Sequence, residues 1–167
     1  AEAAAASGEA VEAVNFNAPG QVVIAGHRAA VERAIAAAKA RGTKRALMLP
    51  VSAPFHSSLL KPAAVRLARK LADTRIATPS IPVLHNVDVA LHPQADAIRT
   101  ALAQQACSPV LWARTIRAFA TAGVTHVVEC GPGKVLATLV KRIDETLEAL
   151  ALTSGSMLDD ALAQLRE

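Results

Sequence analysis

The feature that most constrains the fold of this chain is an alternation of strand-like and helix-like segments between Ser80 and Ile143. Residues 80–89, SIPVLHNVDV, read as a strand, and residues 125–130, THVVEC, form a nearly continuous apolar strand typical of a buried parallel sheet. Helical patterns cover residues 95–107, 112–121 and 135–143. Strands alternating with helices predict a parallel sheet covered by helices on both faces.

The earlier part of the chain predicts a small α+β unit. The expected elements are a helix or frayed lead-in over 1–13, a turn at Asn-Ala-Pro-Gly, a strand over 21–25, a helix over 27–41, a strand over 44–51 and a helix from Ser57. A final amphipathic helix is expected over 156–167.

Composition narrows the class of protein. A length of 167 residues suits one domain or pieces of two, and aromatic residues make up only 2%. With so few stacking surfaces and a net charge of +4, nucleic-acid binding is not expected. Two cysteines do not make a disulfide framework, no apolar run is long enough to span a bilayer, and the first residues do not resemble a signal peptide. These features together predict a reduced, cytoplasmic protein.

His56, in the segment VSAPFHSS, is the strongest candidate for proton-transfer chemistry. Pro54 disfavours helical geometry for the residue before it, so the chain stays extended as it approaches the histidine. Because the ordinary pKa of an imidazole lies near neutrality, His56 suits the role of general base for a hydroxyl group. A partly buried structural histidine is the alternative interpretation.

A nucleophile for such a base is missing from the sequence. No serine stands in the G-x-S-x-G frame that exposes a nucleophile at a strained turn. Ser57 and Ser58 are expected to cap the helix that follows them. ECGPGK also departs from a phosphate-binding loop, since Val135 follows Lys134 where that loop needs serine or threonine. No cysteines and histidines have the spacing of a zinc site.

Five segments together resemble the malonyl-CoA:acyl carrier protein transacylase family. They are NFNAPGQVVIAGH, KRALMLPVSAPFHSSLLKPA, IPVLHNVDV, SPVLWARTI and ECGPGKVLATLVKRI, in matching order from about Val14 to Ile143. The resemblance implies an α/β-hydrolase-like large subdomain with a parallel sheet, into which a small ferredoxin-like α+β subdomain is inserted. On this basis residues 1–54 are the remainder of the small subdomain. Residues 55–167 are then the C-terminal part of the acyltransferase subdomain.

The resemblance also implies roles for four residues. His56 matches the catalytic histidine that activates a serine, and Gln105 falls where the family supplies a main-chain carbonyl to hold that histidine. Asn17 matches an asparagine that faces the active site. Phe55 matches an aromatic residue that restricts the space beside the substrate's α-carbon. The family's serine lies in an upstream GHSxG segment that these residues lack. The resemblance therefore implies the second half of a transacylase, inactive by itself.

The implied reaction is ping-pong transfer of a malonyl group from malonyl-CoA to the phosphopantetheine thiol of acyl carrier protein, in fatty-acid biosynthesis. No permanently bound cofactor or metal is implied. The implied partners are acyl carrier protein, malonyl-CoA and the N-terminal half of the same enzyme, with self-association through an exposed sheet edge as the alternative. Cations suited to steering the acidic carrier are Lys44, Arg45, Lys134, Lys141 and Arg142.

Two other functions stay open from the sequence. One is a non-catalytic fragment that binds acyl carrier protein, because no nucleophile is present. The other is the acyltransferase domain of a polyketide synthase, because that chemistry is the same.

Overall fold

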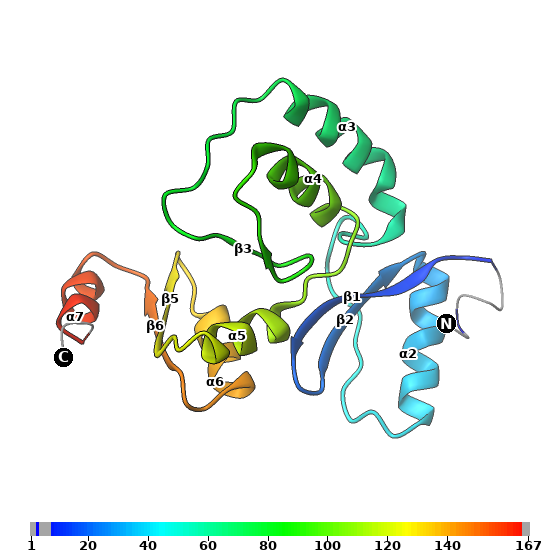
Figure 1. Cartoon of the computed structure of the whole chain (residues 1–167). Helices are drawn as coiled ribbons and strands as arrows, with labels where there is room; N and C mark the ends of the chain where they lie inside the picture. The colour runs from blue at the N-terminus through cyan, green and yellow to red at the C-terminus, as the bar shows by residue number, and fades with distance from the viewer. Residues whose placement is uncertain (1–2, 4–7, 165–167) are drawn as a thin grey trace. The chain divides into compact units, whose positions relative to one another are not determined.

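The computed structural model describes residues 3 and 8–164, and Figure 1 traces the chain through them. The chain divides into two compact units. Unit 1 holds the residues up to Phe16 together with Val22–Leu111, and unit 2 holds Asn17–Gln21 and the residues from Trp112 onward. Each unit has its own secondary structure and its own buried residues, so each is described by itself.

Unit 1 contains most of the first hairpin and the helices that follow it. Its elements are β1 Val11–Ala18, β2 Gln21–Gly26, α2 Arg28–Ala40, the short 3-10 helix η1 Ser58–Leu60, α3 Lys61–Ala72, β3 Leu84–His85, β4 Ala90–Leu91 and α4 Ala95–Gln105. Residues 17–21 at the tip of the β1–β2 hairpin are grouped with unit 2. Helices α3 and α4 pack against each other. The expected helices over 27–41 and 95–107, and the one from Ser57, are confirmed to within a few residues.

Strand β1 corrects the end of the helix expected over residues 1–13, whereas Ala3 is helical. From Val11 onward the chain is a strand that pairs with β2, and Gly20 supplies the positive φ of 71° in the expected turn. Pairing with a neighbouring strand outweighs the helical preference of the alanines in this segment. Residues 1–2 and 4–7 of that expected helix lie outside the described residues.

The end of β2 lies close to the start of β1. A Cβ added at Gly26 would lie 2.1 Å from the carbonyl oxygen of Ala10, so only glycine fits there without a shift of the backbone. The N–H of His27 donates to that same oxygen, and the N–H of Ala10 donates to the Nδ1 of His27. These contacts fix the chain just before β1.

One of the expected strands is wrong, and another is much shorter than expected and differently paired. Residues 44–51 form no strand, and Val51 is 65% exposed. A strand needs a hydrogen-bonded neighbour, and no described residues supply one to this segment. Within residues 80–89 only Leu84–His85 is a strand, and it pairs antiparallel with Ala90–Leu91 instead of joining a parallel sheet.

Unit 2 is an α/β unit around one small core. It contains α5 Trp112–Thr121, β5 His126–Cys130, α6 Val135–Ile143, β6 Glu148–Leu152 and α7 Ser156–Gln164. Strands β5 and β6 pair in parallel with Val128 opposite Leu150, and α6 packs on both strands. Ile116, Val140 and Leu147 form the buried core.

The sequence predicts four of these five elements. Helices α5 and α6 have the expected bounds, and β5 differs by one residue, whereas β6 was not predicted. The expected last helix is present to Gln164, and residues 165–167 lie outside the described residues.

The fold is therefore mixed α/β, as predicted, but its described sheets are each two-stranded. A continuous parallel sheet running from Ser80 to Ile143 is not present among the described residues. The subdomain boundary near residue 54 stays a prediction. No helix in the described part of the chain is both long and apolar enough to cross a membrane.

Candidate active site

His56 lies in a turn of unit 1, after the loop that contains Pro54 and before the helical segment that begins at Ser58. The chain is not extended before the histidine as expected, since it bends at Ala53 and the N–H of Phe55 donates to the Ala53 carbonyl. Its side chain is half-buried. The Nδ1 atom of the ring is 2.8 Å from the carbonyl oxygen of Gln105, at the end of α4. A carbonyl oxygen only accepts hydrogen bonds, so the proton of a neutral imidazole is on Nδ1. The Nε2 atom then carries the lone pair that accepts a proton.

The backbone of His56 is held in an uncommon conformation. Its φ is 63°, in the left-handed region that costs a residue with a side chain roughly 1–3 kcal/mol. Such a conformation persists only where the surrounding structure fixes it, and it concentrates at functional sites. The turn is fixed by hydrogen bonds on both sides of the histidine.

The two serines after His56 do not act as their sequence predicts. Ser57 is fully buried, and its Oγ donates to the carbonyl oxygen of Pro54 at 2.6 Å. Ser58 donates from both its N–H and its Oγ to the carboxylate of Glu12 in β1. Neither hydroxyl caps the following helix, so that expectation is wrong. Glu12 was not identified from the sequence, since it lies 46 residues away and nothing local to it indicates the contact.

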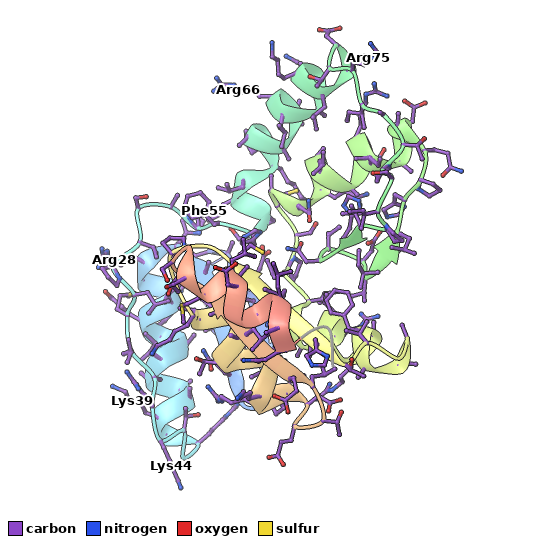
Figure 2. The ribbon with its side chains drawn as sticks, turned by 90° about the vertical axis from the view of Figure 1, so that its left-hand side faces the viewer. Arg28, Lys39, Lys44, Phe55, Arg66 and Arg75 are labelled. Atoms are coloured by element: carbon purple, nitrogen blue, oxygen red, sulfur yellow. The ribbon has the colours of Figure 1, made fainter. Side chains whose placement is uncertain are left out.

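Of the four predicted site residues, the structure brings two into contact, His56 and Gln105. Phe55 precedes the histidine and is 53% exposed, with its ring on the surface of unit 1 (Figure 2). Asn17 is half-buried near the end of β1 and belongs to unit 2. The roles of all four in catalysis or substrate binding stay predictions.

A second group of polar side chains lies on the β3–β4 hairpin. His92 Nε2 is 2.7 Å from an oxygen of Asp88, and the rings of His85 and His92 are 5.1 Å apart. Burial lowers the pKa of His85, the nearby His92 lowers it further, and Asp88 partly opposes this. Burial disfavours the charged form of Asp88, but hydrogen bonds from His92 and from the N–H of Ala90 outweigh it and lower its pKa.

The lowered pKa of His85 predicts that the free energy of unfolding decreases as the pH falls. The folded chain binds a proton at His85 less readily than the unfolded chain does, because the pKa of this group is lowered from its ordinary 6.5 on folding. The stabilisation is thus complete above that pH and is lost as the pH falls through the lower, folded value. We expect the urea midpoint to fall between about pH 7.5 and about pH 5.5, and to fall less in His85→Asn. The control, His126→Asn, keeps the full decrease. An equal decrease in all three proteins contradicts the assignment to His85.

Known proteins resemble this chain over most of its length. No model of a known protein family matches the chain. A malonyl CoA-acyl carrier protein transacylase of Salmonella typhimurium is 54% identical over 159 residues, which are 95% of this chain and 52% of that protein. The protein of the same name from Bacillus subtilis is 39% identical over 160 residues, which are 96% of this chain and 50% of its own length.

Solved structures give the same result. The acyl-carrier-protein S-malonyltransferase of Burkholderia pseudomallei superposes with a TM-score of 0.93 at 54% identity, over 97% of this chain and 52% of that one. A malonyl-transacylase solved in complex with a type II PKS acyl carrier protein superposes with a TM-score of 0.94 at 48% identity, over 98% of this chain and 52% of its own. The chain therefore spans about half the length of the relatives it matches. Over that half it is similar, in sequence and in fold, to malonyl-CoA:acyl carrier protein transacylases.

Proposed function

We propose that this chain supplies the general base of a malonyl-CoA:acyl carrier protein transacylase, with His56 as that base. The observation that carries the proposal is the contact between His56 Nδ1 and the Gln105 carbonyl, which leaves Nε2 as proton acceptor. A carbonyl serves here as aspartate does in a charged triad, because it fixes the tautomer and orients the ring. The similarity of the chain to transacylases of this kind supports the same proposal.

The serine nucleophile comes from polypeptide outside these 167 residues. None of the serines present has the G-x-S-x-G frame. The two serines nearest to His56 in sequence already donate hydrogen bonds to other groups, Ser57 to the Pro54 carbonyl and Ser58 to the Glu12 carboxylate. The whole enzyme is therefore this chain together with a segment that contains GHSxG.

The reaction has two half-reactions that share one base. In the first, Nε2 of His56 takes the serine proton as the serine oxygen attacks the malonyl thioester. Backbone N–H groups stabilise the oxyanion, the carbon–sulfur bond breaks, and the imidazolium returns the proton to the coenzyme A thiolate. In the second, His56 takes the proton of the phosphopantetheine thiol, the thiolate attacks the malonyl-serine ester, and the serine oxygen recovers the proton. No cofactor or metal takes part in either step.

Acyl carrier protein is the proposed acceptor. The solved relative in complex with such a carrier supports this partner. In unit 2, Lys134 precedes α6, and Lys141 and Arg142 lie in its last turn, where they are exposed. These cations suit an acidic carrier, and the last two also suit the negative end of the helix.

Phe55 is proposed to limit the space beside the malonyl α-carbon, and Asn17 to face the substrate. We place the reaction in fatty-acid biosynthesis in the cytoplasm, consistent with two cysteines that are not paired.

Reconstitution tests the proposal. We expect no malonyl-carrier product when the chain alone is mixed with malonyl-CoA and holo acyl carrier protein. Product should appear when the chain is co-expressed with the remainder of the Salmonella typhimurium relative, which carries the missing length. The control is carrier that lacks phosphopantetheine, which offers no thiol and gives no product.

Two outcomes contradict the proposal. Product from the chain alone means that the nucleophile is within these residues. If the co-expressed pair binds malonyl-CoA and gives no product, while the chain binds holo carrier in a saturable, salt-sensitive way, the chain is a carrier-binding module and not part of a catalyst.

A further inference from the structure

The carboxylate of Glu12 makes an unusual connection to the segment that carries His56. Glu12 is half-buried in β1, and both of its oxygens accept hydrogen bonds from one residue, Ser58. The N–H of Ser58 donates to Oε2 at 2.9 Å, and its hydroxyl donates to Oε1. A carboxylate that accepts two hydrogen bonds holds its partner more firmly than a neutral acceptor would.

Ser58 is the first residue of the helical run that follows His56. This run continues from η1 into α3, and no side chain at the N-cap of either helix caps its free N–H groups. Glu12 therefore takes the place of a cap from a different element of unit 1. A negative charge at a helix N-terminus is favourable, which adds to the stability of this arrangement.

The two residues that follow His56 are both anchored. The hydroxyl of Ser57 donates to the carbonyl oxygen of Pro54, which precedes the histidine, so this bond closes the turn around it. Ser58, the next residue, is tied to Glu12, which is distant in sequence. A φ of 63° at a residue with a side chain persists only where the surrounding structure fixes it, and these two anchors act directly beside His56. The ring orientation that aims Nδ1 at the carbonyl of Gln105 is set by the same turn.

We propose that Glu12 is a positioning residue for His56, acting through Ser58 on the left-handed turn. This inference rests on the proposed function of His56 as general base. Glu12 itself touches no reacting atom in this scheme. Its contribution is to keep one ring tautomer and one ring orientation, which lowers the reorganisation needed before proton transfer.

The first experiment measures transfer by the reconstituted whole enzyme. We expect Glu12→Ala and Ser58→Ala each to lower kcat by about 10-fold, with KM for malonyl-CoA changed less than about 3-fold, since the base is misplaced and the substrate contacts remain. Glu12→Gln keeps one acceptor oxygen and is expected to retain an intermediate rate. The matched control is Glu32→Gln on α2, an exposed glutamate whose contact with Arg28 is a surface pair, and its rate should equal that of the parent.

The second experiment observes the ring directly. Nitrogen-15 labelling of the five histidines of this chain, within the whole enzyme, reports the tautomer of each by long-range coupling to its ring protons. His56, assigned by its loss in His56→Gln, should show a single Nδ1-protonated tautomer in the parent. In Glu12→Ala and Ser58→Ala we expect a mixture of tautomers at His56, with the signals of the other four histidines unchanged.

The two measurements separate the possible failures. A fixed His56 tautomer in both variants overturns the positioning role, whether or not the rate falls. Equal rates and equal spectra in parent and variants overturn it as well. If the parent enzyme gives no transfer at all, the proposed function fails. A tautomer mixture confined to the two variants still supports the link from Glu12 to the ring in that case.

Discussion

In the reconstituted enzyme, His56→Ala is expected to lower kcat for malonyl transfer by about 10²- to 10⁴-fold. In the proposed mechanism, the side chain removed is the group that accepts the serine proton and later returns it to the leaving thiolate. Substrate binding does not depend on that proton, so KM for malonyl-CoA should change far less than kcat. A coupled assay of coenzyme A release measures both constants.

The control for this experiment is His126→Ala. His126 begins β5 in unit 2, and its ring contacts the Thr125 hydroxyl instead of a backbone carbonyl. Its replacement should leave kcat within about 2-fold, as is usual for an accessible side chain outside a reaction centre. A His56→Ala enzyme that keeps a near-parental rate contradicts the assignment of the base.

The second large effect is expected in the core of unit 2. Ile116 is fully buried at the centre of the cluster with Val140 and Leu147. Ile116→Ala leaves a cavity among side chains that relax only in part, and we expect the free energy of unfolding to fall by about 2–5 kcal/mol. Urea denaturation of the chain, followed by the fluorescence of Trp112, which packs against this cluster, measures the change.

The same substitution at an exposed site is the control. Ile81 is 75% exposed in unit 1, so Ile81→Ala removes the same atoms with little change in burial. We expect the free energy of unfolding of Ile81→Ala to stay within about 0.5 kcal/mol of the parent. If the two variants unfold at the same urea concentration, the core of unit 2 is not where the buried residues place it.

The helices were the part of the fold best predicted from sequence. In α5 and α6 the apolar residues recur at helical spacing, and the boundaries are marked by Gly123 before β5 and by the Gly-Pro-Gly turn before α6. Such signals are local, so a single sequence carries them completely.

The strands were predicted less well, for a physical reason. A strand depends on the neighbour that satisfies its backbone hydrogen bonds, and that neighbour is often distant in sequence. Residues 44–51 have a strand-like pattern but no pairing partner among the described residues. Glu148–Leu152 lacks β-branched residues and still forms β6, because it pairs with β5.

The candidate site likewise has features that the local sequence predicts and features that depend on distant contacts. His56 follows from its residue type and its place after Pro54. Its contact with the Gln105 carbonyl was expected only from the resemblance to the family. Every residue has a main-chain carbonyl, so the residue type at position 105 does not indicate the contact. The left-handed turn at His56 and the bond from Ser58 to Glu12 were not foreseen, because both arise from tertiary contacts.

Mass spectrometry of the intact, reconstituted enzyme tests the central claim most directly. After a brief exposure to malonyl-CoA and an acid quench, we predict one added malonyl group on the serine-bearing polypeptide, none on this chain, and none on either polypeptide when this chain carries His56→Gln. A malonyl group attached to this chain, or full acylation without the imidazole, contradicts a division of the active site into a base on one polypeptide and a nucleophile on the other.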